Sequence, residues 1–285
     1  MSAQSESFVP LLGWRLSPRL RPFARLALVG LLVLMADQAT EWLGKQGLVL
    51  PTPVVTAFRI AAAATILRYP LAGFVLAVEV DKWDWYWLGM PAADDVAHVA
   101  YQSWDKIMDL VMLTAAAVVT LRWEDRRAKF LALGTYALRV LGVAAFALTG
   151  QRWLLIAFPN VFESVFLLYV IFHVLSRRTE MLTSRSATVL VALALLIPKV
   201  AQEVFLHALE TRPWKIWHIL PWPPVDAWMW GALMFAPPLT ALVVLVWTAH
   251  GRPTKEDPEL EVSALLPDPD PDPAPEARPT TPAAS

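Results

Sequence analysis

The chain has 285 residues, of which 56% are hydrophobic and 14 are tryptophan, and its mean hydropathy is +0.47. A water-soluble domain of this size has no interior large enough for so much apolar sequence, which excludes the ordinary soluble class. The sequence contains no cysteine, which excludes disulfide frameworks, thiol nucleophiles and cysteine-ligated metal sites.

Apolar stretches near 20 residues, the length that crosses a bilayer as a helix, follow a basic N-terminal segment at 1–25. We predict an all-α polytopic transmembrane bundle over residues 26–248. Residues 51–88 contain Pro70, which breaks or kinks a helix, so they form either two spans or one kinked span. The predicted spans are 26–43, 51–68, 70–88, 99–121, 130–150, 153–175, 187–208 and 226–248.

Basic loops set the orientation, because cytoplasmic loops are enriched in Lys and Arg. Basic residues cluster at 122–129, at 177–185 and in the N-terminal segment. All three are cytoplasmic if the chain crosses eight times, with both termini inside; a single kinked span over 51–88 gives seven crossings. We prefer eight. Tryptophans then concentrate on the outer side, where 81–98 and 209–226 are expected as loops in the headgroup layer.

The C-terminal segment at 249–285 differs in composition from the rest of the chain. Its part from 251 onward has 8 acidic and 3 basic residues and alternates Pro with Asp between 267 and 275. Such a sequence cannot bury apolar area, so we predict a disordered cytoplasmic tail, which is either inert or a binding segment for a cytoplasmic protein.

A polar stripe marks the helix that enters the membrane near residue 98. Its members are spaced by three and four residues and fall on one helix face. Charged groups inside a bilayer are costly and face the interior of a bundle or a hydrated cavity. The stripe consists of Asp95, His98, Gln102, Asp105 and Asp109.

Other predicted spans carry smaller polar sets at a similar depth. We expect all of them to line one cavity that is open to the outer side, with Asp105, Asp109, Glu163 and Glu203 as catalytic groups. The substrate-binding residues are predicted to be Arg139, Lys199, Gln102, Asn160, His98, Asp37 and Glu41.

The charge balance of this set suggests its chemistry. Six carboxylates (Asp37, Glu41, Asp105, Asp109, Glu163, Glu203) stand against Lys106, Arg139 and Lys199. Either some carboxylates are protonated or a divalent metal joins them, with Asp105 and Asp109 as its ligands. The alternative is purely structural pairing, of Arg139 with Glu163 and of Lys199 with Glu203.

The pairs Asp81–Asp84 and Asp105–Asp109 resemble the paired-aspartate layout of CDP-alcohol phosphatidyltransferases, whose aspartates hold two metal ions. That family's motif also has Gly, Ala and Arg after the first pair and a Gly before the second. Trp85 stands at the first Gly position, the gap between the pairs is longer, and the site would open outward. We therefore assign the chain to no family.

Three functions agree with these patterns. The first is a membrane enzyme that acts on a lipid or polyprenyl-type substrate by acid–base or metal-assisted chemistry. The second is a proton- or cation-coupled transporter, and the third is a non-catalytic subunit of the cell membrane whose tail recruits a partner. The arginines are explained by topology, and nucleic acid is not an expected partner.

Overall fold

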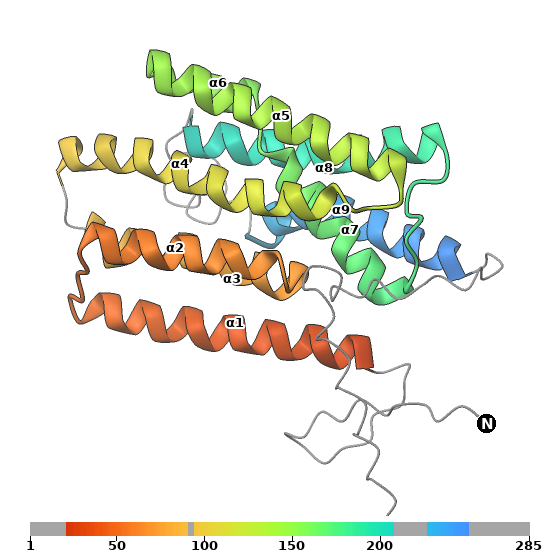
Figure 1. Cartoon of the computed structure of the whole chain (residues 1–285), viewed down its shortest axis with the longest axis horizontal. Coiled ribbons are helices and arrows are strands. Elements are labelled where there is room, and N and C mark those ends of the chain that lie inside the picture. The colour runs from red at the N-terminus through yellow and green to blue at the C-terminus, as the bar shows by residue number, and fades with distance from the viewer. Residues whose placement is uncertain (1–20, 91–93, 208–226, 251–285) are drawn as a thin grey trace, which may run out of the picture.

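The computed structural model describes residues 21–90, 94–207 and 227–250, without the side chains of several residues in α1 and at the ends of other helices. The predicted N-terminal segment up to residue 20, the outer segment 209–226 and the tail from 251 lie outside the described residues. Within the described ranges the chain forms helices and no strand (Figure 1). The helices are α1 (Arg21–Lys45), α2 (Thr52–Ile66), α3 (Pro70–Trp87), α4 (Asp95–Thr120), α5 (Arg126–Thr149), α6 (Trp153–Ala157), α7 (Val161–Ser176), α8 (Arg185–His207) and α9 (Ala227–His250).

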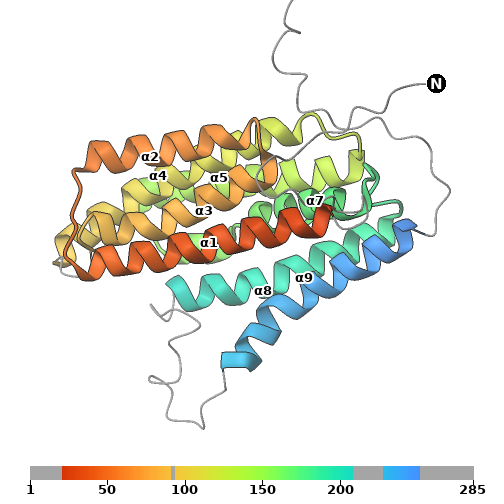
Figure 2. The same cartoon turned by 90° about the horizontal axis from the view of Figure 1, so that it is seen from below.

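Residues 51–88 form two helices rather than one kinked helix. Pro70 occupies the first turn of α3, where a missing backbone N–H costs nothing. A Cβ added at Gly73 would lie 2.5 Å from the backbone nitrogen of Ile66 and 2.7 Å from the carbonyl oxygen of Thr65. The start of α3 therefore folds back tightly on the end of α2, and the two helices lie side by side (Figures 1 and 2).

The predicted span 153–175 is interrupted. Helix α6 ends at Ala157 and α7 begins at Val161, with Pro159 between them. Proline disfavours helical backbone in the residue before it, and Phe158 has φ −120° and ψ 66°, outside the helical region. We call Phe158–Asn160 the helix break.

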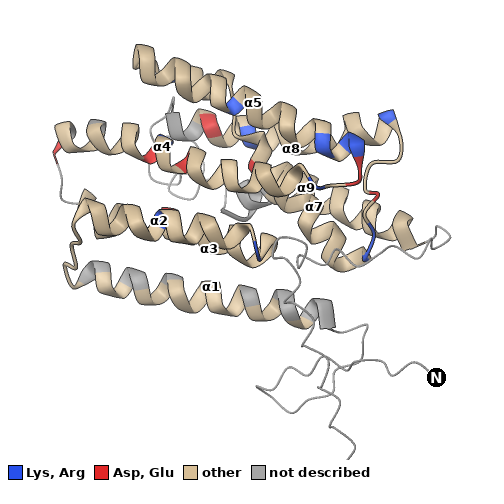
Figure 3. Ribbon diagram, in the orientation of Figure 1, with Lys and Arg blue, Asp and Glu red and all other residues tan. Residues whose placement is uncertain are grey.

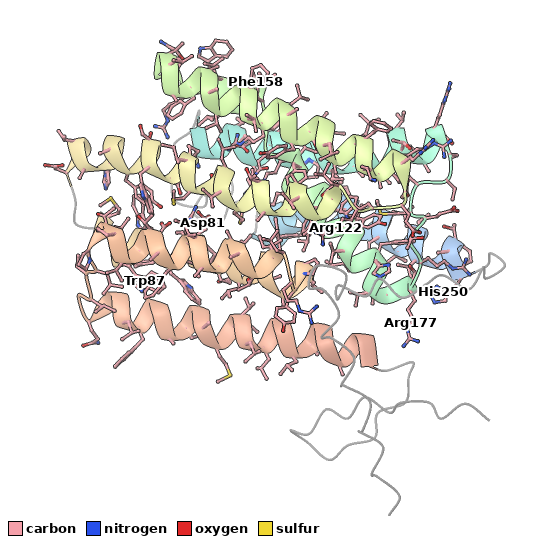
Figure 4. The ribbon with its side chains drawn as sticks, viewed as in Figure 1. Asp81, Trp87, Arg122, Phe158, Arg177 and His250 are labelled. Carbon is pink, nitrogen blue, oxygen red and sulfur yellow. The ribbon has the colours of Figure 1, made fainter. Side chains whose placement is uncertain are left out.

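With α6 and α7 taken as the two parts of one crossing, successive crossings run in opposite directions, so their connections alternate between two ends of the bundle (Figures 1 and 2). Arg122, Arg177 and His250 lie at one end, which we call the basic end, and Trp87 lies toward the other (Figure 4). Lys and Arg residues are more numerous toward the basic end than toward the other end (Figure 3). The two basic loops that the sequence places on one side of a membrane are therefore together in space.

Apolar side chains occupy much of the exterior of the described helices as well as the core. Large apolar side chains are exposed along several helices, including Leu148 (88%), Trp247 (77%) and Leu190 (67%). Three stretches are long and apolar enough to cross a bilayer, Arg126–Thr149, Trp153–Ser176 and Arg185–Val204, and Thr52–Ile66 and Phe235–His250 are shorter apolar helices. The core near the basic end is aromatic: the rings of Trp123 and Tyr169 are stacked, with their centres 3.7 Å apart.

Candidate functional site

Three helices, α2, α3 and α4, bring one arginine together with four aspartates. Arg59 is buried at 4% exposure near the middle of α2. Its Nη1 donates to Asp81 and, at 2.5 Å, to Oδ2 of Asp84. Its Nη2 donates to Oδ1 of Asp109 at 3.1 Å, and its Nη1 lies 3.9 Å from Oδ1 of Asp105. We call these five residues, with Lys106, the aspartate cluster.

Helical spacing explains why the four carboxylates converge. Asp81 and Asp84 are three residues apart on α3, and Asp105 and Asp109 are four apart on α4, so each pair shares a helix face. Asp81 lies between α3 and α4 (Figure 4), and acidic residues mark the same part of α4 in Figure 3. Lys106 closes the cluster from α4, with Nζ 2.7 Å from Oδ2 of Asp105 and 3.0 Å from Oδ2 of Asp109.

Aromatic side chains surround the aspartate cluster. Tyr101 donates from its hydroxyl to Oδ1 of Asp84 at 2.6 Å. The guanidinium carbon of Arg59 lies 5.8 Å from the ring centre of Trp104, a cation–π geometry. Trp104 donates to the hydroxyl oxygen of Thr56 at 3.2 Å, which ties α4 to the first turns of α2. The cluster is thus held by packing as well as by charge.

The aspartate cluster has more negative than positive charge. Four carboxylates stand against Arg59 and Lys106, which leaves a formal charge of −2. Asp84 is fully buried, and the side chains of Asp109, Asp105 and Asp81 are 12%, 13% and 34% exposed. Buried charge without compensation is costly, so the cluster requires protons or an additional cation.

A metal ion has suitable ligands on one side of the aspartate cluster. Asp81, Asp84 and Asp105 each offer an oxygen, and these oxygens lie within 4.8 Å of one another. Both oxygens of Asp84 and of Asp109 already accept hydrogen bonds, whereas Asp81 and Asp105 accept through one oxygen each from the described residues. Carboxylate oxygens are the ligands that Mg²⁺, Ca²⁺ and Mn²⁺ prefer. Asp81 and Asp105 are thus the most available ligands.

A second group of charges surrounds the helix break. Lys199 of α8 donates to Oε2 of Glu163 at 3.0 Å, and the Asn160 side-chain amide donates to the same oxygen at 3.0 Å. The backbone N–H of Asn160 donates to Oε1 of Glu203 at 3.1 Å. Nη1 of Arg139 lies 3.7 Å from that Oε1. We call Arg139, Asn160, Glu163, Lys199 and Glu203 the break cluster; its two cations and two carboxylates balance.

The predicted site residues thus fall into two groups rather than one. Asp105 and Asp109 belong to the aspartate cluster, and Glu163, Glu203, Arg139, Lys199 and Asn160 form the break cluster. Arg139 lies near enough to Lys106 and Asp109 to interact with both electrostatically, so the groups are neighbours. The sequence had suggested the pairs Arg139–Glu163 and Lys199–Glu203 as a structural alternative. In the structure the partners are exchanged: Lys199 contacts Glu163, and Arg139 contacts Glu203.

The remaining predicted residues lie elsewhere or are not described. The ring of His98 bonds through Nε2 to the carbonyl oxygen of Met90 at 2.8 Å and stacks on Trp85 at 5.3 Å, so it anchors the α3–α4 connection. Gln102 is partly buried on α4, one turn before Asp105. The side chains of Asp37 and Glu41 lie outside the described residues.

Sequence reasoning left Arg59, Asp81, Asp84 and Tyr101 out of the predicted site. The expected outer loop from residue 81 is in fact the last part of α3, which continues to Trp87 and holds Asp81 and Asp84 within the bundle. Arg59 had a usable signal, because a lone arginine inside an apolar helix requires buried partners. Tyr101 precedes Asp105 by about one helical turn. Nothing in the sequence around it indicated that its hydroxyl would contact an aspartate.

Comparisons with known proteins add nothing to this geometry: no family model, curated protein or solved structure matches the chain.

Proposed function

We propose that the chain is a multi-pass protein of the cell membrane with eight spans and both termini in the cytoplasm. The three apolar stretches and the exposed apolar side chains support membrane association. The common position of Arg122 and Arg177 at the basic end supports a cytoplasmic assignment for that end (Figure 4). In this topology α3 and α4, which carry the four aspartates of the cluster, also cross the membrane, next to the apolar spans.

We further propose that the protein is an enzyme whose aspartate cluster binds a divalent cation and acts on a lipid or polyprenyl-type substrate. The observation that supports this most strongly is the surplus of two negative charges among four aspartates from α3 and α4. A divalent cation held by Asp81, Asp84 and Asp105 would neutralise that surplus and would supply Lewis-acid chemistry to a bound substrate. The side chain of Asp81 is the most exposed of the four, so a substrate would reach the cluster from the side of Asp81.

Metal binding by the purified protein tests the first part of this proposal. After treatment with a chelator, the detergent-solubilised chain is titrated with Mn²⁺ and free Mn²⁺ is measured by electron paramagnetic resonance. We expect the wild type to bind Mn²⁺ and the Asp105→Asn variant to lose that binding. Glu124→Gln is the matched control, because it removes an exposed carboxylate outside the cluster. Equal Mn²⁺ uptake by wild type and Asp105→Asn contradicts the proposal.

The lipid composition of membranes tests the second part. Cells that produce the wild type, Asp105→Asn or Glu124→Gln are compared by mass spectrometry of their lipid extracts, at matched protein levels in the membrane. We expect a lipid species to change with the wild type and Glu124→Gln but not with Asp105→Asn. Identical extracts argue against a lipid enzyme, and loss of the Asp105→Asn protein from the membrane favours a structural role.

A cation- or proton-coupled transporter is the second candidate, and the helix break favours it. Transporters place interrupted helices, with freed carbonyls and charged side chains, at their ion and substrate sites. Here the carbonyl of Phe158 leaves the helical pattern and accepts from Arg139 at 3.1 Å. Proteoliposomes distinguish the two functions, since only a coupled transporter gives a substrate-driven change of internal pH.

A further inference from the structure

Two buried polar atoms at the helix break have no hydrogen-bond partner among the residues that the structure describes. They are the Nε of Arg139 and the Oδ1 of Asn160. The two residues are only 2% and 6% exposed. A buried donor or acceptor without a partner is costly, and native proteins satisfy nearly all such groups with protein groups or ordered water. These two atoms therefore indicate a ligand position.

Both residues approach the same carboxylate oxygen of Glu203. Oε1 of Glu203 accepts from the backbone N–H of Asn160 at 3.1 Å and lies 3.7 Å from Nη1 of Arg139. The same Nη1 donates to the carbonyl oxygen of Phe158 at 3.1 Å. The guanidinium group of Arg139 and the backbone N–H of Asn160 are thus linked through one oxygen of Glu203, next to the N-terminus of α7, a helix of 16 residues.

The charge of the surroundings restricts the kind of ligand. Among the described residues, Arg139 and Lys199 balance Glu163 and Glu203, so the break cluster has a formal charge of zero. An added ion would be buried without compensation, which is costly. This contrasts with the aspartate cluster, whose charge of −2 favours a cation. The ligand at the helix break is therefore uncharged.

The hydrogen-bonding pattern restricts it further. Nε of Arg139 is a donor and requires an acceptor, whereas Oδ1 of Asn160 is an acceptor and requires a donor. A hydroxyl group supplies both through one oxygen atom. We propose that the helix break binds one uncharged hydroxyl group, which accepts a hydrogen bond from Arg139 Nε and donates one to Asn160 Oδ1.

Water and a lipid alcohol carry the same hydroxyl chemistry. The apolar side chains Val143, Phe146 and Leu155 pack together on α5 and α6, beside the break, and Trp153 at the start of α6 is 59% exposed. An alkyl chain attached to the hydroxyl would lie among apolar groups. This site is separate from the proposed metal site, and its existence does not depend on the proposed enzymatic function.

A structure determined at high resolution tests the site itself. The full-length wild type is reconstituted in nanodiscs of phosphatidylethanolamine and phosphatidylglycerol, and its structure is determined by electron cryo-microscopy. We expect density within about 3.2 Å of both Arg139 Nε and Asn160 Oδ1. If the two atoms bond directly to each other or to protein groups, with no density between them, the proposal is wrong.

Thermal unfolding distinguishes the two sources of the hydroxyl. The detergent-solubilised protein is titrated with 1-dodecanol and, separately, with n-dodecane, which has the same chain without the hydroxyl. A lipid alcohol at the site predicts a midpoint rise of about 3 °C or more with dodecanol alone once the site is nearly saturated. The rise should be absent in Asn160→Leu and retained in Gln151→Leu, a matched amide replacement at an exposed position.

Each combination of results has a defined meaning. An alcohol-specific rise in the wild type that Asn160→Leu abolishes supports a lipid alcohol. Density at the site without such a rise supports water as the hydroxyl ligand. Equal effects of dodecanol on the wild type and on Asn160→Leu, together with no density, overturn the proposal. The wild-type structure keeps the test valid even if Asn160→Leu fails to fold.

Discussion

Arg59 of α2 and Asp84 of α3 form an ion pair in which Nη1 and Oδ2 are 2.5 Å apart and the two side chains are 3% and 0% exposed. The same guanidinium also contacts Asp81 and Asp109. Loss of one partner from a buried pair leaves the other charge uncompensated. Arg59 is therefore the group on which the arrangement of α2, α3 and α4 depends.

Replacement of Arg59 by Gln is expected to lower the free energy of unfolding by about 3 to 5 kcal/mol, because it leaves buried aspartates without their main counter-ion. Denaturant unfolding in detergent micelles measures the change. Arg68→Gln, at an exposed position on the turn between α2 and α3, is the control and should have little effect. A double variant, Arg59→Gln with Asp84→Asn, should recover part of the loss; no recovery would contradict the electrostatic explanation.

Much of the fold follows from local signals in the sequence. The predicted span 130–150 is the larger part of α5, whose start is capped by the Asp125 side chain and whose end is followed by Gly150 at φ 69°. Both are residues that favour helix ends. The length of the apolar stretches predicted the helices, and the basic residues predicted that the two basic loops lie at the same end. Both features depend on the solvent around each segment rather than on particular side-chain contacts.

The candidate site was less predictable, because pairing depends on how helices rotate against one another. Helix periodicity placed Asp105 and Asp109 on one face correctly. It could not decide whether Lys199 turns toward Glu203 on its own helix or toward Glu163 on α7. Both carboxylates are within reach of a long lysine side chain, and only the packing of α7 against α8 selects between them.

Gly142 and Gly134 offer a matched test of helix packing within α5. A Cβ at Gly142 would lie 2.3 Å from Cβ of Phe158, whereas a Cβ at Gly134 would meet nothing within 4 Å. We expect Gly142→Ala to lower the free energy of unfolding by about 1 to 3 kcal/mol through overpacking. Gly134→Ala should be neutral or stabilise by up to about 1 kcal/mol, the difference in helix propensity. Equal effects in denaturant unfolding would mean that α5 and the helix break are not in close contact.

The absence of cysteine from the sequence allows the proposed membrane topology to be tested with single introduced thiols. Glu124→Cys and Thr183→Cys lie in the α4–α5 and α7–α8 connections, and Gln151→Cys lies between α5 and α6; all three positions are exposed. Intact cells are treated with a membrane-impermeant maleimide. We expect labelling of Gln151→Cys alone, with the other two labelled only after the membrane is opened. Labelling of all three in intact cells would contradict the assignment.

The contact between Lys199 and Glu163 predicts a specific energetic coupling across α7 and α8. Nζ and Oε2 are 3.0 Å apart, and the side chains are 11% and 25% exposed. A double-mutant cycle with Lys199→Met and Glu163→Gln should therefore give a coupling energy of about 0.5 to 3 kcal/mol. The matched cycle of Lys199→Met with Glu203→Gln should give a smaller value, because Glu203 accepts instead from Asn160 and lies beside Arg139. A larger coupling in the second cycle would show that Lys199 pairs along its own helix, and the break cluster would then need a different arrangement of charges.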